Sequence, residues 1–192
     1  MIRVFGYLLA IAIAAGLLLA MQRSTPGYAN LTGPIPVVGK VGDLIETRRF
    51  DVTLETIRFA RRLHFTRYGR NHERDTTGVW AVVTAKFSAR NVSVTVNSAT
   101  WQGPTELRYS ASSRVENAPG VLLGRRLEPG LSPQRGLIIF EIPADQVADA
   151  TLLVSETNWP RLDSEARISL SSPATGTALV ADMLELNRLA DD

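Results

Sequence analysis

The hydropathy pattern of the chain begins with an uninterrupted apolar stretch, residues 4–21, that contains no charged side chain. A helix of this length rises by about 1.5 Å per residue and would span roughly 27 Å, close to the hydrocarbon core of a bilayer. The stretch has no polar stripe, which a buried helix of a soluble domain would keep. We therefore predict a transmembrane signal anchor over residues 1–22, with a cleaved secretory signal peptide as the alternative.

The charges on the two sides of this stretch are nearly equal and do not by themselves decide its orientation in the membrane. Arg3 precedes the stretch and Arg23 follows it, and the N-terminal amine adds one charge to the first side. We predict a single-pass protein of the cytoplasmic (inner) membrane with its domain on the extracytoplasmic side, or a cleaved and secreted form. The chain has no cysteine, which excludes a lipid-attached cysteine, disulfides and thiolate metal sites.

The clearest pattern in the rest of the chain is strict alternation over residues 79–90. Val79, Val83 and Phe87 fall on one side of this segment, while the other side carries Trp80 and polar residues. Alternation with period two is typical of a β-strand, because successive side chains point to opposite faces. The segment is predicted to be a long strand with one buried face.

A second alternating segment changes phase in its middle. Apolar residues alternate from Phe50 to Leu54 and again from Ile57 to Phe59, but in the opposite phase. A shift by one residue is what a β-bulge produces, so we predict a bulge near Glu55 and Thr56.

Several shorter strands are separated by turn residues, and together they indicate the fold class. They are predicted at residues 92–96, around 107–109, and at 121–127, 136–142, 150–155 and 166–170. Seven to eight short strands predict an all-β, immunoglobulin-like β-sandwich over residues 39–172. Its predicted core contains Val79, Val83, Phe87, Leu153 and either Ile138 or Ile139.

Three segments lie outside the strand pattern. Residues 23–38 are rich in proline and glycine and are predicted to be a linker. Residues 61–78 are polar and predicted to be a long loop or a loosely ordered hairpin tip. In the tail, residues 173–192, the helical spacing of Leu179, Met183, Leu186 and Leu189 predicts a short amphipathic helix, which packs on its own domain or on a partner.

The net charge of +2 hides an uneven distribution of charge. Residues 40–74 carry nine basic and five acidic side chains, whereas residues 141–192 carry three basic and ten acidic ones. The basic segment contains a set of arginines interleaved with aromatic residues: Arg58, Arg61, Arg62, Arg67, Arg70 and Arg74. These arginines are candidates for contact with lipid headgroups, an anionic envelope polymer or an acidic protein. The alternative is a solvated face that is paired with the acidic C-terminal part.

Three stretches carry a resemblance to a known family. They are GKVG and FDVTL at residues 39–42 and 50–54, the strand at 80–91, and L-x-P-G followed by G-x-x-x-F-x-x-P at 127–143. Together they resemble extracytoplasmic immunoglobulin-like domains of the telokin-like, DUF4352 type. The resemblance covers residues 39–170 and implies a fold and an extracytoplasmic location without a catalytic role. Many members are tethered by a lipidated cysteine, which the apolar stretch would have to replace here.

Motifs for catalysis and cofactor binding are incomplete in this sequence. His72 and Glu73 begin like H-E-x-x-H, but Thr76 occupies the position of the second histidine. Gly130 and Ser132 begin like G-x-S-x-G, but Gln134 ends the motif, and no phosphate-binding glycine loop is present. We predict no enzyme activity, cofactor, metal, nucleic acid or small-molecule substrate.

The expected function is that of a non-enzymatic, membrane-anchored interaction module, an accessory or scaffolding subunit of an envelope complex. The alternative is a secreted or tethered protein that binds an anionic envelope polymer or lipid headgroups through its arginines.

Overall fold

The computed structural model describes residues 2–24, 31–170 and 180–191. Internal contacts divide the chain into two units, Met1–Gly33 and Pro34–Asp192, which are considered separately. In the first unit, the apolar stretch forms the helix α1 (Ile2–Ser24). No helix among the described residues is long and apolar enough to cross a membrane.

The second unit is built almost entirely of strands. In chain order, its elements are β1 (Ile35–Lys40), β2 (Ile45–Glu46), β3 (Phe50–Arg67), β4 (Arg70–Ala89), β5 (Val94–Thr95), β6 (Ser98–Gln102), β7 (Arg108–Ser110), the 3-10 helix η1 (Ser113–Val115), β8 (Arg126–Leu127), β9 (Gln134–Ile142), the 3-10 helix η2 (Ala144–Gln146), β10 (Thr151–Ser155), β11 (Ser164–Ser169), β12 (Val180–Glu185) and the helix α3 (Leu186–Asp191).

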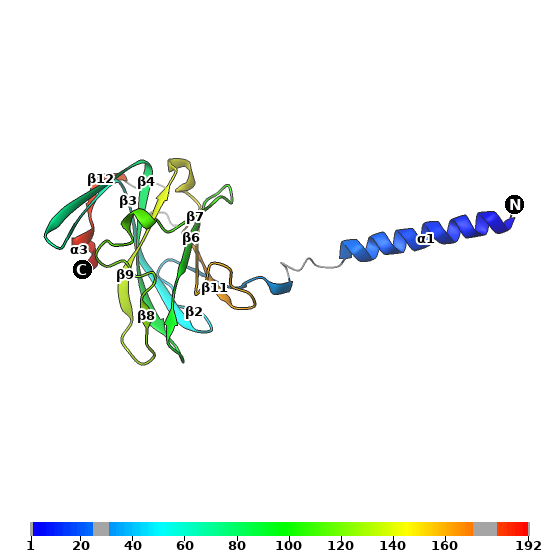
Figure 1. Ribbon diagram of the computed structural model, residues 1–192, viewed down its shortest axis with the longest axis horizontal. Helices are drawn as coiled ribbons and strands as arrows, with labels where there is room; N and C mark the ends of the chain where they lie inside the picture. Colours follow the sequence, from blue (N-terminus) through cyan, green and yellow to red (C-terminus); the bar gives the residue numbers. More distant parts are fainter. Residues whose placement is uncertain (1, 25–30, 171–179, 192) are drawn as a thin grey trace. The chain divides into compact units, whose positions relative to one another are not determined.

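Ten of these strands form two sheets that pack face to face (Figure 1). Sheet A has the strand order β1-β11-β10-β6-β7, and sheet B has the order β12-β3-β4-β9 with β2 paired to the start of β3. The pairs β1–β11 and β12–β3 are parallel, and the other pairs are antiparallel. The prediction of a β-sandwich is confirmed, with more strands than the seven or eight that the pattern suggested.

The main core lies between the two sheets. Trp101 is fully buried at its centre, edge-on to Phe59, and its Nε1 donates a hydrogen bond to the carbonyl oxygen of Gln146 over 2.8 Å. Phe87 is also fully buried and packs against Phe50 with ring centroids 6.1 Å apart. The buried N–H of Trp101 thus has a partner, which avoids the cost of an unsatisfied donor.

A second core covers the outer face of sheet B. Trp80 and Ile139 lie there beneath Leu186 of α3 and Val115 of η1. The strand β4 is therefore buried on both faces, and the prediction of one buried face was wrong. The same arrangement places Ile138 in the main core and Ile139 in the second core, so both are buried. The other residues of the predicted core are also buried: Val79, Val83, Phe87 and Leu153.

The first strand begins inside the segment predicted as a linker. β1 starts at Ile35 and pairs in parallel with β11, so the folded unit begins earlier than residue 39. Proline lacks a backbone N–H and is confined to sheet edges, and Pro36 lies on such an edge strand. The linker prediction was wrong for residues 35–38.

The polar segment 61–78 forms a hairpin, one of its two predicted alternatives, but as a regular ladder and not as a loosely ordered tip. It is not a loop, because β3 continues to Arg67 and β4 begins at Arg70 in one long antiparallel hairpin. The predicted bulge is present between Leu54 and Thr56, and a second bulge lies between Ala60 and Arg62.

The C-terminal tail is a strand before it is a helix. β12 pairs with the outer edge of β3, and only Leu186–Asp191 is helical. The prediction of a helix through Met183 was wrong, because the unpaired edge of β3 offers backbone hydrogen bonds that favour a strand. Leu179 lies outside the described residues.

Candidate functional site

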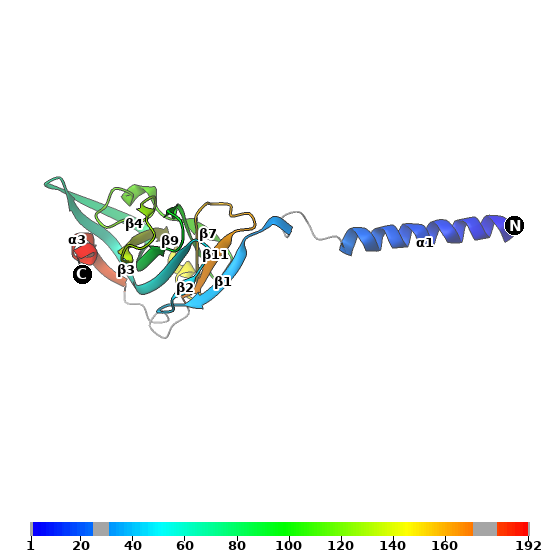
Figure 2. The same cartoon turned by 90° about the horizontal axis from the view of Figure 1, so that it is seen from below.

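The β3–β4 hairpin is the most prominent feature available for binding. Figure 2 shows its closed end on the opposite side of the domain from β1 and β11. The turn consists of Tyr68 and Gly69, both with positive φ (51° and 70°), as a two-residue hairpin turn of the I′ type requires. Tyr68 is 88% exposed. The hairpin thus presents a large aromatic side chain to solvent at its end.

Tyr68 occupies a backbone position that does not suit it. Asparagine, aspartate and glycine are preferred at the first position of such a turn, because other residues are strained at positive φ. A tyrosine with a solvent-exposed ring gains no burial there that would offset this strain. Strained residues are concentrated at functional sites, which points to a binding role for Tyr68.

The end of the hairpin is held in place by its neighbours. The Asn187 side chain of α3 accepts a hydrogen bond from the backbone N–H of Thr66 (2.7 Å) and donates one to its carbonyl oxygen (3.1 Å). The Arg67 guanidinium donates to the carbonyl oxygen of Asn117 over 2.6 Å. A hairpin fixed in this way loses little conformational entropy when it binds a partner.

The six predicted arginines do not form a single patch. Residues that pair across an antiparallel ladder share a face. Arg67 pairs with Arg70, and Arg74 pairs with Leu63, so these three arginines lie on the face of the second core. Arg62 pairs with Asp75 on the opposite face, and Arg61 lies in the second bulge. Arg58 pairs with Val82, nearer the body of the domain.

The arginines also differ in how far they are neutralised. Arg62 forms an ion pair with Glu73 (3.3 Å), and Arg74 lies over the Phe65 ring. Within residues 31–170 and 180–191, no ion pair joins Arg58, Arg61 or Arg70 to a carboxylate. Among the described residues, the ion pair of this set joins Arg62 to Glu73 of the same hairpin, so the alternative of a face paired with the acidic C-terminal part is not seen there.

The two arginines beside the turn oppose each other directly. Arg67 and Arg70 form the last pair of the ladder, and like charges in this position destabilise a hairpin. The Arg67 guanidinium lies 4.8 Å from the centre of the Tyr68 ring. We call Arg67, Tyr68 and Arg70 the basic tip. Its arrangement favours a partner that brings negative charge and a surface for an aromatic ring.

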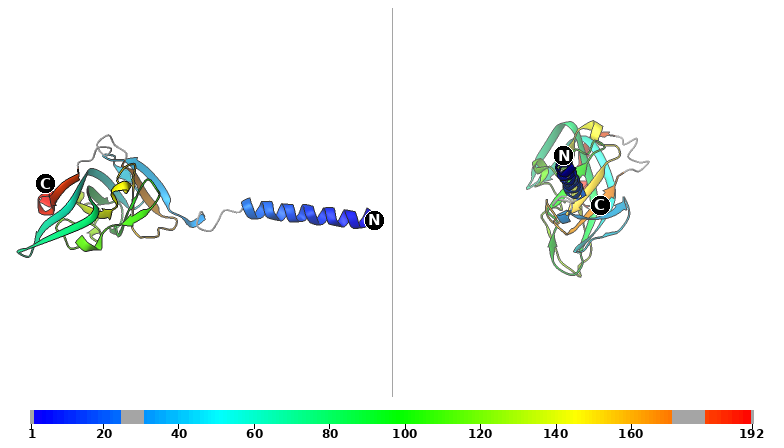
Figure 3. Two further views of the ribbon diagram at one scale, coloured as in Figure 1. Left: turned by 90° about the horizontal axis from the view of Figure 1, so that it is seen from above. Right: turned by 90° about the vertical axis from the view of Figure 1, so that its right-hand side faces the viewer.

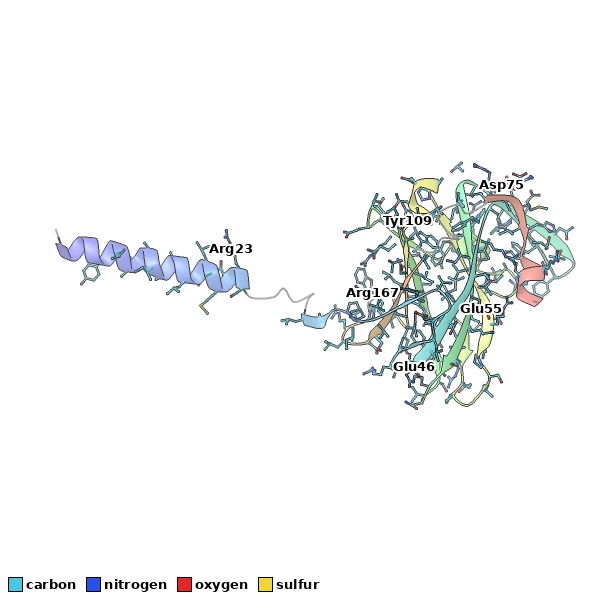
Figure 4. All side chains as sticks on the ribbon, turned by 180° about the vertical axis from the view of Figure 1, so that it is seen from behind. Arg23, Glu46, Glu55, Asp75, Tyr109 and Arg167 are labelled. Atoms are coloured by element: carbon cyan, nitrogen blue, oxygen red, sulfur yellow. The ribbon has the colours of Figure 1, made fainter. Side chains whose placement is uncertain are left out.

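A separate ionic cluster joins sheet B to α3. Glu55 lies at the first bulge and contacts Lys86 (2.6 Å) and Arg135 (2.7 Å). Arg135 also donates to the carbonyl oxygen of Leu189 over 3.0 Å, at the C-terminal end of α3. Figure 4 labels Glu55 between Asp75, toward the hairpin, and Glu46, toward the opposite end of sheet B. Hydrogen bonds from Lys86 and Arg135 lower the pKa of Glu55.

This lowered pKa predicts a specific acid sensitivity. The ionised Glu55 contributes its full stabilisation above its unfolded pKa of about 4.3, and the contribution is lost as the pH falls through the lower folded pKa. We expect the free energy of unfolding of Glu55→Gln to depend less on pH than that of the native chain below about pH 5. The measurement is urea unfolding across that range. Glu106→Gln, at an exposed carboxylate, should retain the native pH dependence.

The predicted partner-helix residues divide between two environments. Leu186 and Leu189 are buried in the second core of their own domain, whereas Met183 on β12 is half exposed. The structure therefore favours the alternative that this segment packs on its own domain. Leu179 is outside the described part of the chain.

The two histidines and a polar hollow are further candidates for a site. The His64 ring shares a hydrogen bond with the Glu185 carboxylate, and His72 stacks on Phe65. In the part of the chain that the structure describes, no group of three or more histidine, aspartate or glutamate side chains could hold a metal ion. A hollow of about 360 Å³ lies beside β6 and β7, and its polar lining includes Asn97, Ser110, Ser112 and Asn158. No sequence motif indicated this hollow.

Comparisons with known proteins support the fold alone. No family model matches the chain, and no curated protein matches it. The secreted protein MPT63 from Mycobacterium tuberculosis is similar in structure, with 15% identity and a TM-score of 0.51 over 72% of this chain and 98% of that one. An uncharacterized β-sandwich protein from Clostridium difficile has 10% identity and a TM-score of 0.47 over 77% and 100% of the two chains. The resemblance to the DUF4352 type stays a prediction, and the chain is shown to have a β-sandwich fold.

Proposed function

We propose that this protein is a non-enzymatic extracytoplasmic interaction module that docks on an acidic surface of a protein partner through the basic tip. The partner would be a component of an envelope membrane complex, with this chain as its accessory or scaffolding subunit. The observation that carries the proposal is the exposed Tyr68 at positive φ between Arg67 and Arg70.

The composition of the basic tip suits a protein partner. Tyrosine and arginine are enriched among the residues that dominate protein–protein binding energy. A tyrosine supplies a large contact area at low entropic cost, and an arginine binds carboxylates through two parallel hydrogen bonds. The fixed base of the hairpin adds preorganisation, as the contacts of Asn187 and Arg67 show.

The membrane anchor is part of this proposal and rests on the sequence. Residues 4–21 carry no charge, and a helix of that length matches a bilayer core. The experiment is alkaline carbonate extraction of membranes from cells that express the full chain. Retention in the membrane pellet supports an uncleaved anchor. Release of a protein whose N-terminus follows Ala20 or Ala29 contradicts it and supports the secreted form.

The second candidate is an anionic envelope polymer or a lipid headgroup as the ligand of the arginines. The observation in its favour is charge, since residues 58–75 contain six arginines and only two carboxylates, Glu73 and Asp75. Such binding would weaken steeply with salt, because exposed charges are screened within about 8 Å at physiological ionic strength.

One pair of substitutions separates binding from folding. Tyr68→Asn creates an Asn-Gly turn, which is favoured at positive φ, and Arg70→Ser removes the opposed charge. We expect this double variant to be at least as stable as the native chain and to lose binding to its protein partner by tenfold or more. The measurements are the urea unfolding midpoint and a pull-down at two ionic strengths.

The control for this prediction is an arginine pair on another part of the surface. Arg108→Ser with Arg125→Ser removes two exposed positive charges outside the hairpin and should leave partner binding unchanged. Parallel pull-downs with anionic liposomes and envelope polymer test the second candidate. If the double variant loses only liposome or polymer binding, the protein-docking proposal is wrong and the second candidate takes its place.

A further inference from the structure

The loop between β10 and β11, residues 156–163, exposes two large apolar side chains. Trp159 is 85% exposed and Leu162 is 58% exposed. The loop lies beside the start of β1, where the backbone N–H of Ile35 donates to the carbonyl oxygen of Asp163 over 2.9 Å. Ile35 is itself 53% exposed. The loop and the start of β1 thus carry three exposed apolar residues at the end of the domain where its first strand begins.

This loop is tied to the domain by an ion pair at each end. At its start, Glu156 forms an ion pair with Arg49 (2.7 Å), and at its end Asp163 forms one with Arg48 (3.1 Å). Between them Pro160 is buried and fixes the middle of the loop. Trp159 remains exposed in a loop anchored at both ends, although its ring is among the largest apolar groups of the chain.

The backbone of the loop adds an independent indication of function. Leu162 has a φ of 51°, in the left-handed region that a leucine rarely occupies. A strained backbone persists only where the surrounding contacts impose it, and such positions are concentrated at binding sites. Leu162 thus combines an unfavourable backbone conformation with an exposed apolar side chain in the same loop as Trp159.

We infer that the surface formed by Ile35, Trp159 and Leu162 seats in the headgroup region of the bilayer that holds the N-terminal helix. The inference rests on the membrane anchor of the proposed function. Tryptophan is enriched at membrane interfaces because its ring is apolar and its N–H remains hydrated. Arg48 and Arg49 flank the loop and balance the charges of Asp163 and Glu156, so the rim of this surface carries no unmatched negative charge from these two carboxylates.

The length of the chain favours the bilayer as the occupant. Met21 ends the apolar stretch, and the 14 residues from there to Ile35 can span at most about 50 Å. The end of the domain that carries Ile35 is therefore the part tethered most closely to the anchor. Because the tether limits its distance from the anchor, an apolar surface at this end meets the membrane interface at a high effective concentration.

This placement determines which end of the domain faces the membrane and which end faces away from it. In the left view of Figure 3, the closed end of the β3–β4 hairpin lies on the far side of the domain from β1. With the loop seated on the bilayer, the basic tip points away from it. The same bilayer could then not serve as the ligand of the tip, which leaves the tip free for a partner.

The three tryptophans of the chain allow a direct test. Trp80 and Trp101 are fully buried, so Trp159 alone is accessible to a quencher in the lipid. The full chain is reconstituted into liposomes that contain lipids brominated near the headgroup end of the acyl chain. We expect bromine to quench part of the tryptophan emission of the native chain. The emission of Trp159→Phe, which keeps only the two buried tryptophans, should not be quenched. Leu162→Ser should reduce the quenching, whereas Leu131→Ser, at an exposed leucine outside the loop, should not.

Carbonate extraction of the same liposomes separates this inference from the anchor. If the chain resists extraction but Trp159 is not quenched by bromolipid and stays open to aqueous acrylamide, the membrane-facing surface is wrong and the anchor stands. If Trp159 is shielded from both quenchers, a protein surface such as a second copy covers it, and the inference is also wrong. If the chain is extracted, both the anchor and the inference fail.

Discussion

Replacing Phe87 with alanine is expected to lower the free energy of unfolding of the domain by about 3–5 kcal/mol. Phe87 is fully buried between the sheets and packs against Phe50, so its removal leaves a cavity that its neighbours can fill only in part. The measurement is urea unfolding of the unit Pro34–Asp192, followed by tryptophan fluorescence. Trp80 and Trp101 lie in the two cores and report on both of them.

Leu131→Ala is the matched control for this substitution. Leu131 lies on an exposed turn, and a change there should move the free energy of unfolding by less than about 0.5 kcal/mol. Equal effects of the two substitutions would show that Phe87 is not in a packed core, and the assignment of the sandwich interior would have to be abandoned.

The second large effect is expected at the C-terminus, where Leu186→Ala should cost about 2–5 kcal/mol. Leu186 is fully buried in the second core against the outer face of sheet B, and Arg135 fixes the end of α3 beside it. The C-terminal segment is thus part of the folded domain and covers β4. Met183→Ala, at a half-exposed position on β12 three residues before Leu186, should cost far less.

This comparison also distinguishes two roles for the C-terminal leucines. If Leu186 contacted a partner instead of its own domain, Leu186→Ala would leave unfolding unchanged and weaken only partner binding. That result would contradict the second core.

The sandwich could be predicted because its central strands carry local signals. Residues 79–90 alternate strictly, and the phase change beside Glu55 correctly indicated the bulge between Leu54 and Thr56. The strands at β9, β10 and β11 were also indicated by short β-branched runs bounded by turn residues. Alternation signals a face that is repeated every second residue, and the continuous apolar run of β9 is typical of a strand buried on both faces.

The missed elements depend on contacts between distant parts of the chain. β1 pairs with β11, some 130 residues away, and its Pro36 read locally as a linker residue. The hairpin beyond Ala60 has few apolar positions, because its polar face is in solvent and its other face meets α3 and η1. The spacing of Met183, Leu186 and Leu189 matched a helix, whereas the edge of β3 makes the first part a strand.

The candidate site was indicated only in part. The excess of arginine in residues 58–75 was visible in the sequence, but the register that divides these arginines between two faces was not. Tyr68 is one of the aromatic residues interleaved with the arginines, but its place in the turn could not be predicted, because Asn, Asp or Gly is preferred at that position. Trp159 had no signal at all, because exposure is a property of the folded domain.

Affinity purification of the full chain from mild-detergent membranes tests the central claim most directly. The account predicts that one protein partner copurifies in stoichiometric amount with the native chain and with the Arg108→Ser, Arg125→Ser control. The same partner should be absent from the purification of the Tyr68→Asn, Arg70→Ser variant, which remains folded. A native chain that purifies alone and monodisperse at its native expression level would contradict the account.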